Sequence, residues 1–187
     1  MKISKLSYSI SILLIAFFIQ SASSQSNFGI KAGATAYGFH KQSSANTDEI
    51  GFSFGATYQK NITENVHFRP ELLLTRKGGW VRLDFGTVVP EDLYYVEAPL
   101  LLNWEFINNF SLQAGPQLGI LIAEKSRDES FSELGANTFN ADASGGFLWE
   151  LSNRINLNAR YSYGLTKVFE NFEYYNSAIS LALEYEL

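Results

Sequence analysis

The chain has 187 residues and a formal net charge of −5, which is enough length for one domain with a sizeable core. An acidic chain lacks the clustered Lys and Arg that phosphates require, so nucleic acid is not expected as a partner. The absence of cysteine excludes disulfides, thiolate chemistry and a lipid-modified cysteine.

Residues 1–24 are predicted to be a signal peptide. Lys2 and Lys5 precede an apolar run over residues 10–19, and small residues follow at a site suited to cleavage between Ser24 and Gln25. A membrane anchor is the alternative, but the run is shorter than the roughly 18 residues that a spanning helix needs. Residues 25–187 are predicted to form one domain, in which no segment resembles a membrane helix.

Eight strands are predicted from the alternation of apolar and polar side chains, which point to opposite faces of a strand. Most reach the roughly 9–11 residues that cross a bilayer at a tilt. The last strand is the clearest, since every second residue from Tyr175 to Leu187 is apolar except Ser177. The predicted strands are Asn27–Phe39, Ile50–Lys60, Val66–Thr75, Leu93–Phe106, Phe110–Ala123, Thr138–Glu150, Ile155–Thr166 and Tyr175–Leu187.

The predicted connections alternate between short and long. The short ones cover residues 61–65, 107–109 and 151–154, and the long ones cover residues 40–49, 76–92, 124–137 and 167–174. Short turns on one side and long loops on the other are typical of a transmembrane barrel, with the turns in the periplasm. Residues 80–85 still alternate, so the second long loop can extend its hairpin above the membrane.

One face of the predicted strands is apolar and free of charge. Lipid favours such a face, because Arg or Lys at the bilayer midplane costs about 2–4 kcal/mol. The predicted lipid-facing band includes Phe54, Leu72, Leu100, Leu118, Leu157 and Leu181. Aromatic residues gather toward the strand ends, where rings lie at headgroup level. The predicted aromatic girdle consists of Tyr58, Phe68, Trp104, Phe106, Trp149 and Tyr185.

The other face is rich in Gly, Ser, Asn and Gln, which suits the narrow interior of an eight-stranded barrel. Arg69, Glu71, Glu97 and Arg160 all lie on this face. They are predicted to form a network of two guanidiniums and two carboxylates that seals the lumen. The alternative is that each charge is separately hydrated in a wet lumen.

A soluble, secreted lipocalin-like barrel is the main alternative fold. It would turn the apolar face inward around an apolar ligand. Two observations count against it. The polar face carries few of the Lys and Glu residues usual on a soluble exterior, and aromatic residues from nearly every strand would overfill an eight-stranded interior.

Four segments resemble the PorT-like outer-membrane β-barrel family of Bacteroidetes, over essentially the whole mature chain. They are residues 69–78 (RPELLLTRKG), 95–102 (YVEAPLLL), 114–119 (AGPQLG) and 160–165 (RYSYGL). The resemblance implies an eight-stranded outer-membrane barrel, and the family's namesake takes part in a secretion system. The chain ends on Leu187, where many such barrels end on an aromatic residue read by the barrel-assembly machinery. Leu187 keeps the apolar parity, so assembly is still expected.

No catalytic, cofactor or metal site is predicted. The histidines are His40, in a loop with serines and acids, and His67, on the polar face. A nucleophile, a base and an orienting acid are not arranged around either one. The acidic loop residues lack the regular ligand spacing of a calcium site.

The sequence therefore predicts an all-β fold: a single eight-stranded, antiparallel, up-and-down transmembrane barrel with short periplasmic turns and four longer extracellular loops. The expected function is a non-enzymatic structural or interaction role at the cell outer membrane, with a secretion accessory as one form of it. The expected partners are outer-membrane lipid, the barrel-assembly machinery, and envelope or secretion proteins that contact the loops. A narrow pore for small solutes is a further alternative.

Overall fold

The computed structural model describes residues 28–41, 44–82, 88–126, 135–169 and 173–187, and the predicted signal peptide and its cleavage site lie outside these ranges. The described residues form nine strands of one antiparallel sheet. They are β1 (Phe28–Lys41), β2 (Ser44–Tyr58), β3 (Lys60–Asn61), β4 (Val66–Arg82), β5 (Val88–Ile107), β6 (Phe110–Ser126), β7 (Phe139–Ser152), β8 (Ile155–Lys167) and β9 (Tyr175–Glu186).

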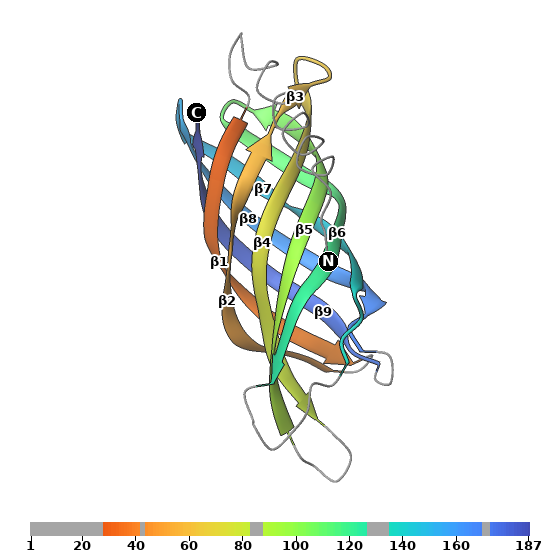
Figure 1. Ribbon diagram of the computed structural model, residues 1–187. Helices are drawn as coiled ribbons and strands as arrows, with labels where there is room; N and C mark the ends of the chain where they lie inside the picture. Colours follow the sequence, from red (N-terminus) through yellow and green to blue (C-terminus); the bar gives the residue numbers. More distant parts are fainter. Residues whose placement is uncertain (1–27, 42–43, 83–87, 127–134, 170–172) are drawn as a thin grey trace, which may run out of the picture.

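The sheet closes into a barrel because β2 pairs with β4 as well as with β1 (Figure 1). The two-residue strand β3 continues the wall of β2 after a break at Gln59 and pairs with the start of β4. Together they count as one strand of an eight-stranded wall. Each strand pairs with the strands before and after it in the chain, and β1 pairs with β9. The predicted eight-stranded antiparallel barrel is confirmed.

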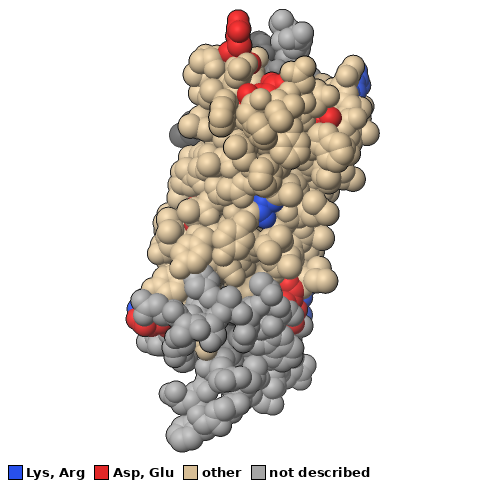
Figure 2. Space-filling view, turned by 180° about the vertical axis from the view of Figure 1, so that it is seen from behind, with Lys and Arg blue, Asp and Glu red and all other residues tan. Residues whose placement is uncertain are grey.

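The apolar face of every strand points outward. Large exposed side chains include Ile30 and Phe54 on the first hairpin, and Leu181 and Leu183 on β9. On the face seen in Figure 2, the described surface between the two ends shows few charged side chains, with one small patch of Lys or Arg. This arrangement is opposite to that of the lipocalin-like alternative, which needs the apolar residues inside.

Two predicted outer loops are largely strand. The first, residues 40–49, was expected to be irregular, yet β1 and β2 remain paired up to Lys41 and Ser44. The pairing continues past a register shift between Tyr37 and Gly38, where a bulge absorbs the mismatch. The second, residues 76–92, contains the ends of β4 and β5, which stay paired up to Arg82 and Val88. The alternation over residues 80–85 had indicated such an extension.

The short turns all lie at one end of the barrel, together with the C-terminal end of β9 (Figure 1). The link between β5 and β6 is the pair Asn108–Asn109, and Asn109 has a φ of 69°. Asn is one of the few residues that adopt this left-handed conformation readily. By the usual layout of transmembrane barrels this end is periplasmic. The described residues include no helix long and apolar enough to span a membrane.

Candidate functional site

The barrel interior is filled by polar and charged side chains, and Glu71 of β4 is the centre of one group. Arg160 of β8 donates from Nη2 to Glu71 Oε1 at 2.7 Å and from Nη1 to Oε2 at 3.0 Å. Lys31 of β1 lies on the other side, with Nζ 3.1 Å from Oε2. All three side chains are almost fully buried. A paired guanidinium–carboxylate contact with a second cation is among the stronger polar contacts available to a buried acid.

A second ion pair extends this group toward the periplasm. Arg69 donates from Nη2 to Glu184 of β9, and Thr57 donates to the same carboxylate oxygen at 2.7 Å. The Nε atom of Arg69 lies 3.9 Å from Glu71 Oε1, which joins the two pairs. We call Lys31, Arg69, Glu71, Arg160 and Glu184 the periplasmic-side cluster. It links β1, β4, β8 and β9 across the lumen.

A separate group lies nearer the outer end. Lys77 of β4 has its Nζ 2.5 Å from Glu97 Oε1 and 3.1 Å from Asp142 Oδ2. The same ammonium lies 5.3 Å from the centroid of the Tyr95 ring and 5.9 Å from that of Tyr37, within the range of a cation–π contact. We call Lys77, Glu97 and Asp142 the outer-side cluster. Lys77 is 1% exposed, so its charge depends on these partners.

The two clusters carry opposite excess charge. The periplasmic-side cluster has three cations and two carboxylates, and the outer-side cluster has one cation and two carboxylates. A cavity of about 20 Å³ lies between them, bounded by Lys31 and Arg160 on one side and by Lys77 and Glu97 on the other. The space between the two clusters therefore has room for about one water molecule.

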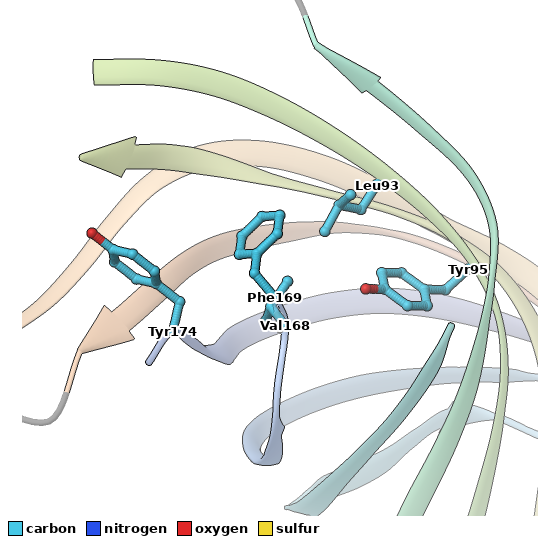
Figure 3. Close-up of a cluster of buried hydrophobic side chains, with 5 residues drawn as sticks. All are labelled: Leu93, Tyr95, Val168, Phe169 and Tyr174. Carbon is cyan, nitrogen blue, oxygen red and sulfur yellow. The ribbon is translucent and has the colours of Figure 1, made fainter. Parts of the chain in front are cut away.

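An apolar cluster lies inside the barrel at its outer end (Figure 3). Val168 and Phe169, just after β8, turn inward and pack with Tyr174 and with side chains of β5. Backbone bonds hold this segment, since Asn137 N donates to Val168 O at 2.7 Å and Val168 N donates to Tyr174 O at 2.8 Å. The sequence had indicated an outer loop over residues 167–174. The members of the apolar cluster are Leu93, Tyr95, Val168, Phe169 and Tyr174.

The structure places all four predicted network residues in the interior but divides them between the two clusters. Arg69, Glu71 and Arg160 lie together. Glu97 does not join them, and its partner is Lys77. The reason is the register between strands, because Glu97 pairs with Leu73, two positions nearer the outer end than Glu71.

Sequence reasoning missed four members of these clusters: Lys31, Lys77, Asp142 and Glu184. Lys31, Asp142 and Glu184 lie on the predicted polar face, so their place in the alternation of side chains was a usable signal. Lys77 was hidden, because the strand was predicted to end at Thr75 and it therefore fell in a loop. Its position two residues beyond Thr75, on the same face, is the signal that a longer strand would have supplied.

The predicted outer-face residues all lie on the outside. In the lipid-facing band, Phe54, Leu72, Leu118 and Leu181 are exposed, and Leu100 and Leu157 are partly exposed. In the girdle, Trp104, Phe106, Trp149 and Tyr185 are exposed, and Tyr58 and Phe68 are partly exposed. Aromatic rings contact one another at the periplasmic end. The ring centroids of Phe28 and Tyr58 are 4.8 Å apart, and those of Trp104 and Phe106 are 6.0 Å apart.

His67 lies near the periplasmic end, with its Nδ1 2.8 Å from Asn61 Oδ1. The side chain of His40 and most of the acidic loop residues fall outside the described part of the chain. Among the side chains that are described, no three His, Cys, Asp or Glu residues are grouped to hold a metal ion.

A closed eight-stranded barrel with an apolar exterior and a polar interior defines a transmembrane barrel of the outer-membrane type. The model of the outer membrane protein beta-barrel domain family matches residues 18–170, so the chain belongs to this family and its location is the outer membrane.

Solved structures show the same fold. The chain is similar to Neisserial surface protein A, with 16% identity and a TM-score of 0.63 over 88% of this chain and 100% of that one. It is also similar to Ail, the attachment invasion locus protein of Yersinia pestis, with 14% identity and a TM-score of 0.53 over 87% of this chain and 99% of that one. No curated protein matches.

Proposed function

We propose that this protein acts by contact at the outer membrane, without catalysis and without passing solutes. The observation that carries the proposal is the filled interior. Two buried charge clusters and an apolar cluster occupy the lumen in series from the periplasmic to the outer end. A barrel built in this way offers its surface, and not its interior, to other molecules. The narrow-pore alternative needs a continuous water path, and buried side chains at three successive positions along the lumen count against one.

The hairpin of β4 and β5 is the element best placed for such contact. It projects past the barrel at the end opposite the short turns (Figure 1), with pairing from Gly78 and Asp92 to Arg82 and Val88. Its base is braced, because Arg76 Nη2 donates to both carboxylate oxygens of Asp92 at 2.9 and 3.0 Å. Arg76 Nη1 also donates to the carbonyl of Ile50 on β2 at 3.3 Å. The described part of the hairpin thus extends the paired wall, and these contacts brace its base.

The resemblance to the PorT-like family of Bacteroidetes directs this contact role toward protein secretion, with the barrel as an accessory at the envelope. Ail, which has the same fold, is described as an attachment invasion locus protein, which is also a role carried by contact. In this proposal the chain is exported by its signal peptide and inserted by the barrel-assembly machinery. Its partners are then outer-membrane lipid and an envelope or secretion protein at the hairpin.

A shortened hairpin tests the proposal. Gly79 and Glu91 are paired across the hairpin, so residues 80–90 can be replaced by Asn-Gly, a two-residue turn that suits such a ribbon. A strain that lacks the gene is complemented with the wild type or with this variant. Sensitivity to detergent and the amount of secreted protein are then measured. We expect the shortened variant to assemble, with the usual heat-dependent shift on SDS gels, and to fail to restore either property.

The control variant is Asn109→Gly, which alters a turn at the periplasmic end, keeps its left-handed backbone and leaves the hairpin intact. It is expected to complement fully. If the shortened variant complements as well as the wild type does, the hairpin is not the contact element and the proposed role is wrong.

A further inference from the structure

A groove of about 530 Å³ runs over β1 on the outer surface of the barrel. Its floor is low because Ala32 is small and lies in register between Phe54 of β2 and Leu183 of β9. The outward side chains that line it are apolar except for one phenol: Ile30, Ala32, Phe54, Ile155, Leu183 and Tyr185. The volume falls within the roughly 300–1,000 Å³ that is typical of small-molecule sites.

The groove lies near the periplasmic end of the barrel. Ile155 is the first residue of β8, Tyr185 is next to the end of β9, and Ile30 is the third residue of β1. All three belong to the apolar outer face, which lipid covers in a transmembrane barrel. A molecule in the groove therefore comes from the membrane leaflet on the periplasmic side.

A cation stands at the periplasmic rim of the groove. Arg154, in the turn between β7 and β8, is exposed and donates from Nη1 to the phenol oxygen of Tyr185 at 3.2 Å. This contact holds the guanidinium beside a ring that lines the groove. The nearby carboxylate of Glu186 accepts from Asn156 Nδ2 at 2.8 Å, so it has its own partner on the inner face. A guanidinium carries five N–H donors in a planar fork that matches a phosphate group.

We propose that this groove binds one glycerophospholipid of the periplasmic leaflet. One acyl chain lies over Ala32, and the phosphate is held by Arg154. Charge complementarity selects this occupant, because an apolar groove that ends at a cation at headgroup level matches an acyl chain joined to an anionic headgroup. The inference rests on the barrel facing lipid and is independent of the contact role of the hairpin.

Native mass spectrometry of the purified protein with added phosphatidylglycerol tests the proposal. Ala32→Trp fills the floor of the groove, and Ala159→Trp is its matched control. Ala159 also faces outward between a Phe and a Leu, namely Phe147 and Leu181, but it does not line the groove. We expect the wild type and Ala159→Trp to retain one lipid with equal affinity. Ala32→Trp is expected to bind at least about tenfold more weakly, since roughly 1.4 kcal/mol of lost apolar contact has this effect.

Arg154→Gln is the second variant. It lies in an exposed turn, so the barrel should fold normally, and it should weaken phosphatidylglycerol binding at least about threefold while leaving diacylglycerol binding unchanged. Equal lipid retention by the wild type, Ala32→Trp and Arg154→Gln would overturn the proposal. A dimer that Ala32→Trp abolishes would also overturn it, because the groove would then belong to a second copy. Preferential retention of lipopolysaccharide would overturn the assignment to the periplasmic leaflet.

Discussion

At the residue scale, Glu71 is a buried carboxylate that accepts hydrogen bonds from cations on two other strands. Removal of its carboxylate leaves Lys31 and Arg160 close together without their shared partner. We therefore predict that Glu71→Ala destabilises the barrel by about 3–5 kcal/mol, the usual cost of breaking a buried pair. Urea unfolding in lipid vesicles, followed by tryptophan fluorescence, measures the change.

An exposed ion pair supplies the control for Glu71. Lys167 Nζ and Glu173 Oε1 are 3.1 Å apart, but their side chains are 43% and 59% exposed. Water screens such a pair, so Glu173→Ala should change the free energy of unfolding by less than about 1 kcal/mol. Equal losses in the two variants would mean that the lumen is wet enough to hydrate Glu71.

Two neighbouring leucines of β5 lie on opposite faces of the barrel wall, so they test the assignment of the faces. Leu100 lies on the outer face, and Leu101 is fully buried inside. Leu100→Arg places a charge in the lipid-facing band and should cost about 2–4 kcal/mol or prevent insertion. Leu101→Gln should be milder, because its amide points into an interior that already contains amides. Assembly and unfolding of both variants are compared in vesicles, and identical behaviour would show that the faces are wrongly assigned.

At the element scale, two adjacent glycines of β7 differ in how closely the neighbouring strand approaches. A Cβ atom on Gly146 would lie 2.1 Å from the carbonyl oxygen of Ala159, whereas one on Gly145 would be 3.6 Å from its nearest neighbour. A backbone oxygen cannot move aside as a side chain can. We predict that Gly146→Ala costs about 1–3 kcal/mol, as overpacking usually does.

Gly145→Ala is the matched control, and it should stay within about 0.5 kcal/mol of the wild type. The temperature at which each variant loses its folded, fast-migrating band on SDS gels gives the comparison. A Gly146→Ala barrel as heat-stable as Gly145→Ala would show that β7 and β8 can separate without cost at this point.

The same scale shows what could be predicted from the sequence. The alternation of apolar and polar residues was enough to find all eight strands of the wall and to orient their faces, because the two-residue period of side-chain direction is a local property of a strand. It could not find the outer ends of two hairpins, which are the last residues of β1 and β4 and the first residues of β2 and β5. Strand pairing continues above the membrane in these hairpins, and no longer has to separate a lipid face from a lumen face. Lys77 was missed for this reason.

The charge partners were out of reach for a different reason. Arg69 and Glu184 are 115 positions apart in sequence and meet across the lumen. Their contact depends on the tilt of the strands and on the register of every pair around the barrel, which together set the height of each side chain. The alternation of side chains assigns a residue to the lumen, but its position along the barrel axis decides its partner. Glu97 has the predicted parity and, because it lies higher, a different partner.

At the scale of the whole molecule, chemically different groups occupy the lumen at successive positions between the periplasmic and the outer end. The periplasmic-side cluster joins four strands, the outer-side cluster adds a buried lysine between two carboxylates, and the apolar cluster lies at the outer end. The apolar cluster and the outer-side cluster meet at Tyr95, whose ring lies 5.3 Å from Lys77 Nζ, and the periplasmic-side cluster shares no residue with either. The loss of one cluster should therefore leave the barrel closed, even where it lowers stability.

Planar-bilayer recordings can test this closure. We predict that the wild type shows no steady conductance, and that Phe169→Ser, which weakens the apolar cluster, also stays closed because both charge clusters remain below it. Arg160→Ala should lower stability by less than the about 3–5 kcal/mol of a fully broken buried pair, because Glu71 loses its two guanidinium hydrogen bonds but keeps Lys31, and it should still not conduct. A wild type that conducts steadily, with Glu71→Ala and Arg160→Ala unchanged in both conductance and stability, would contradict a sealed lumen and favour a narrow pore. A current that first appears in Phe169→Ser would place the seal at the outer mouth, since water would then pass the charge clusters freely.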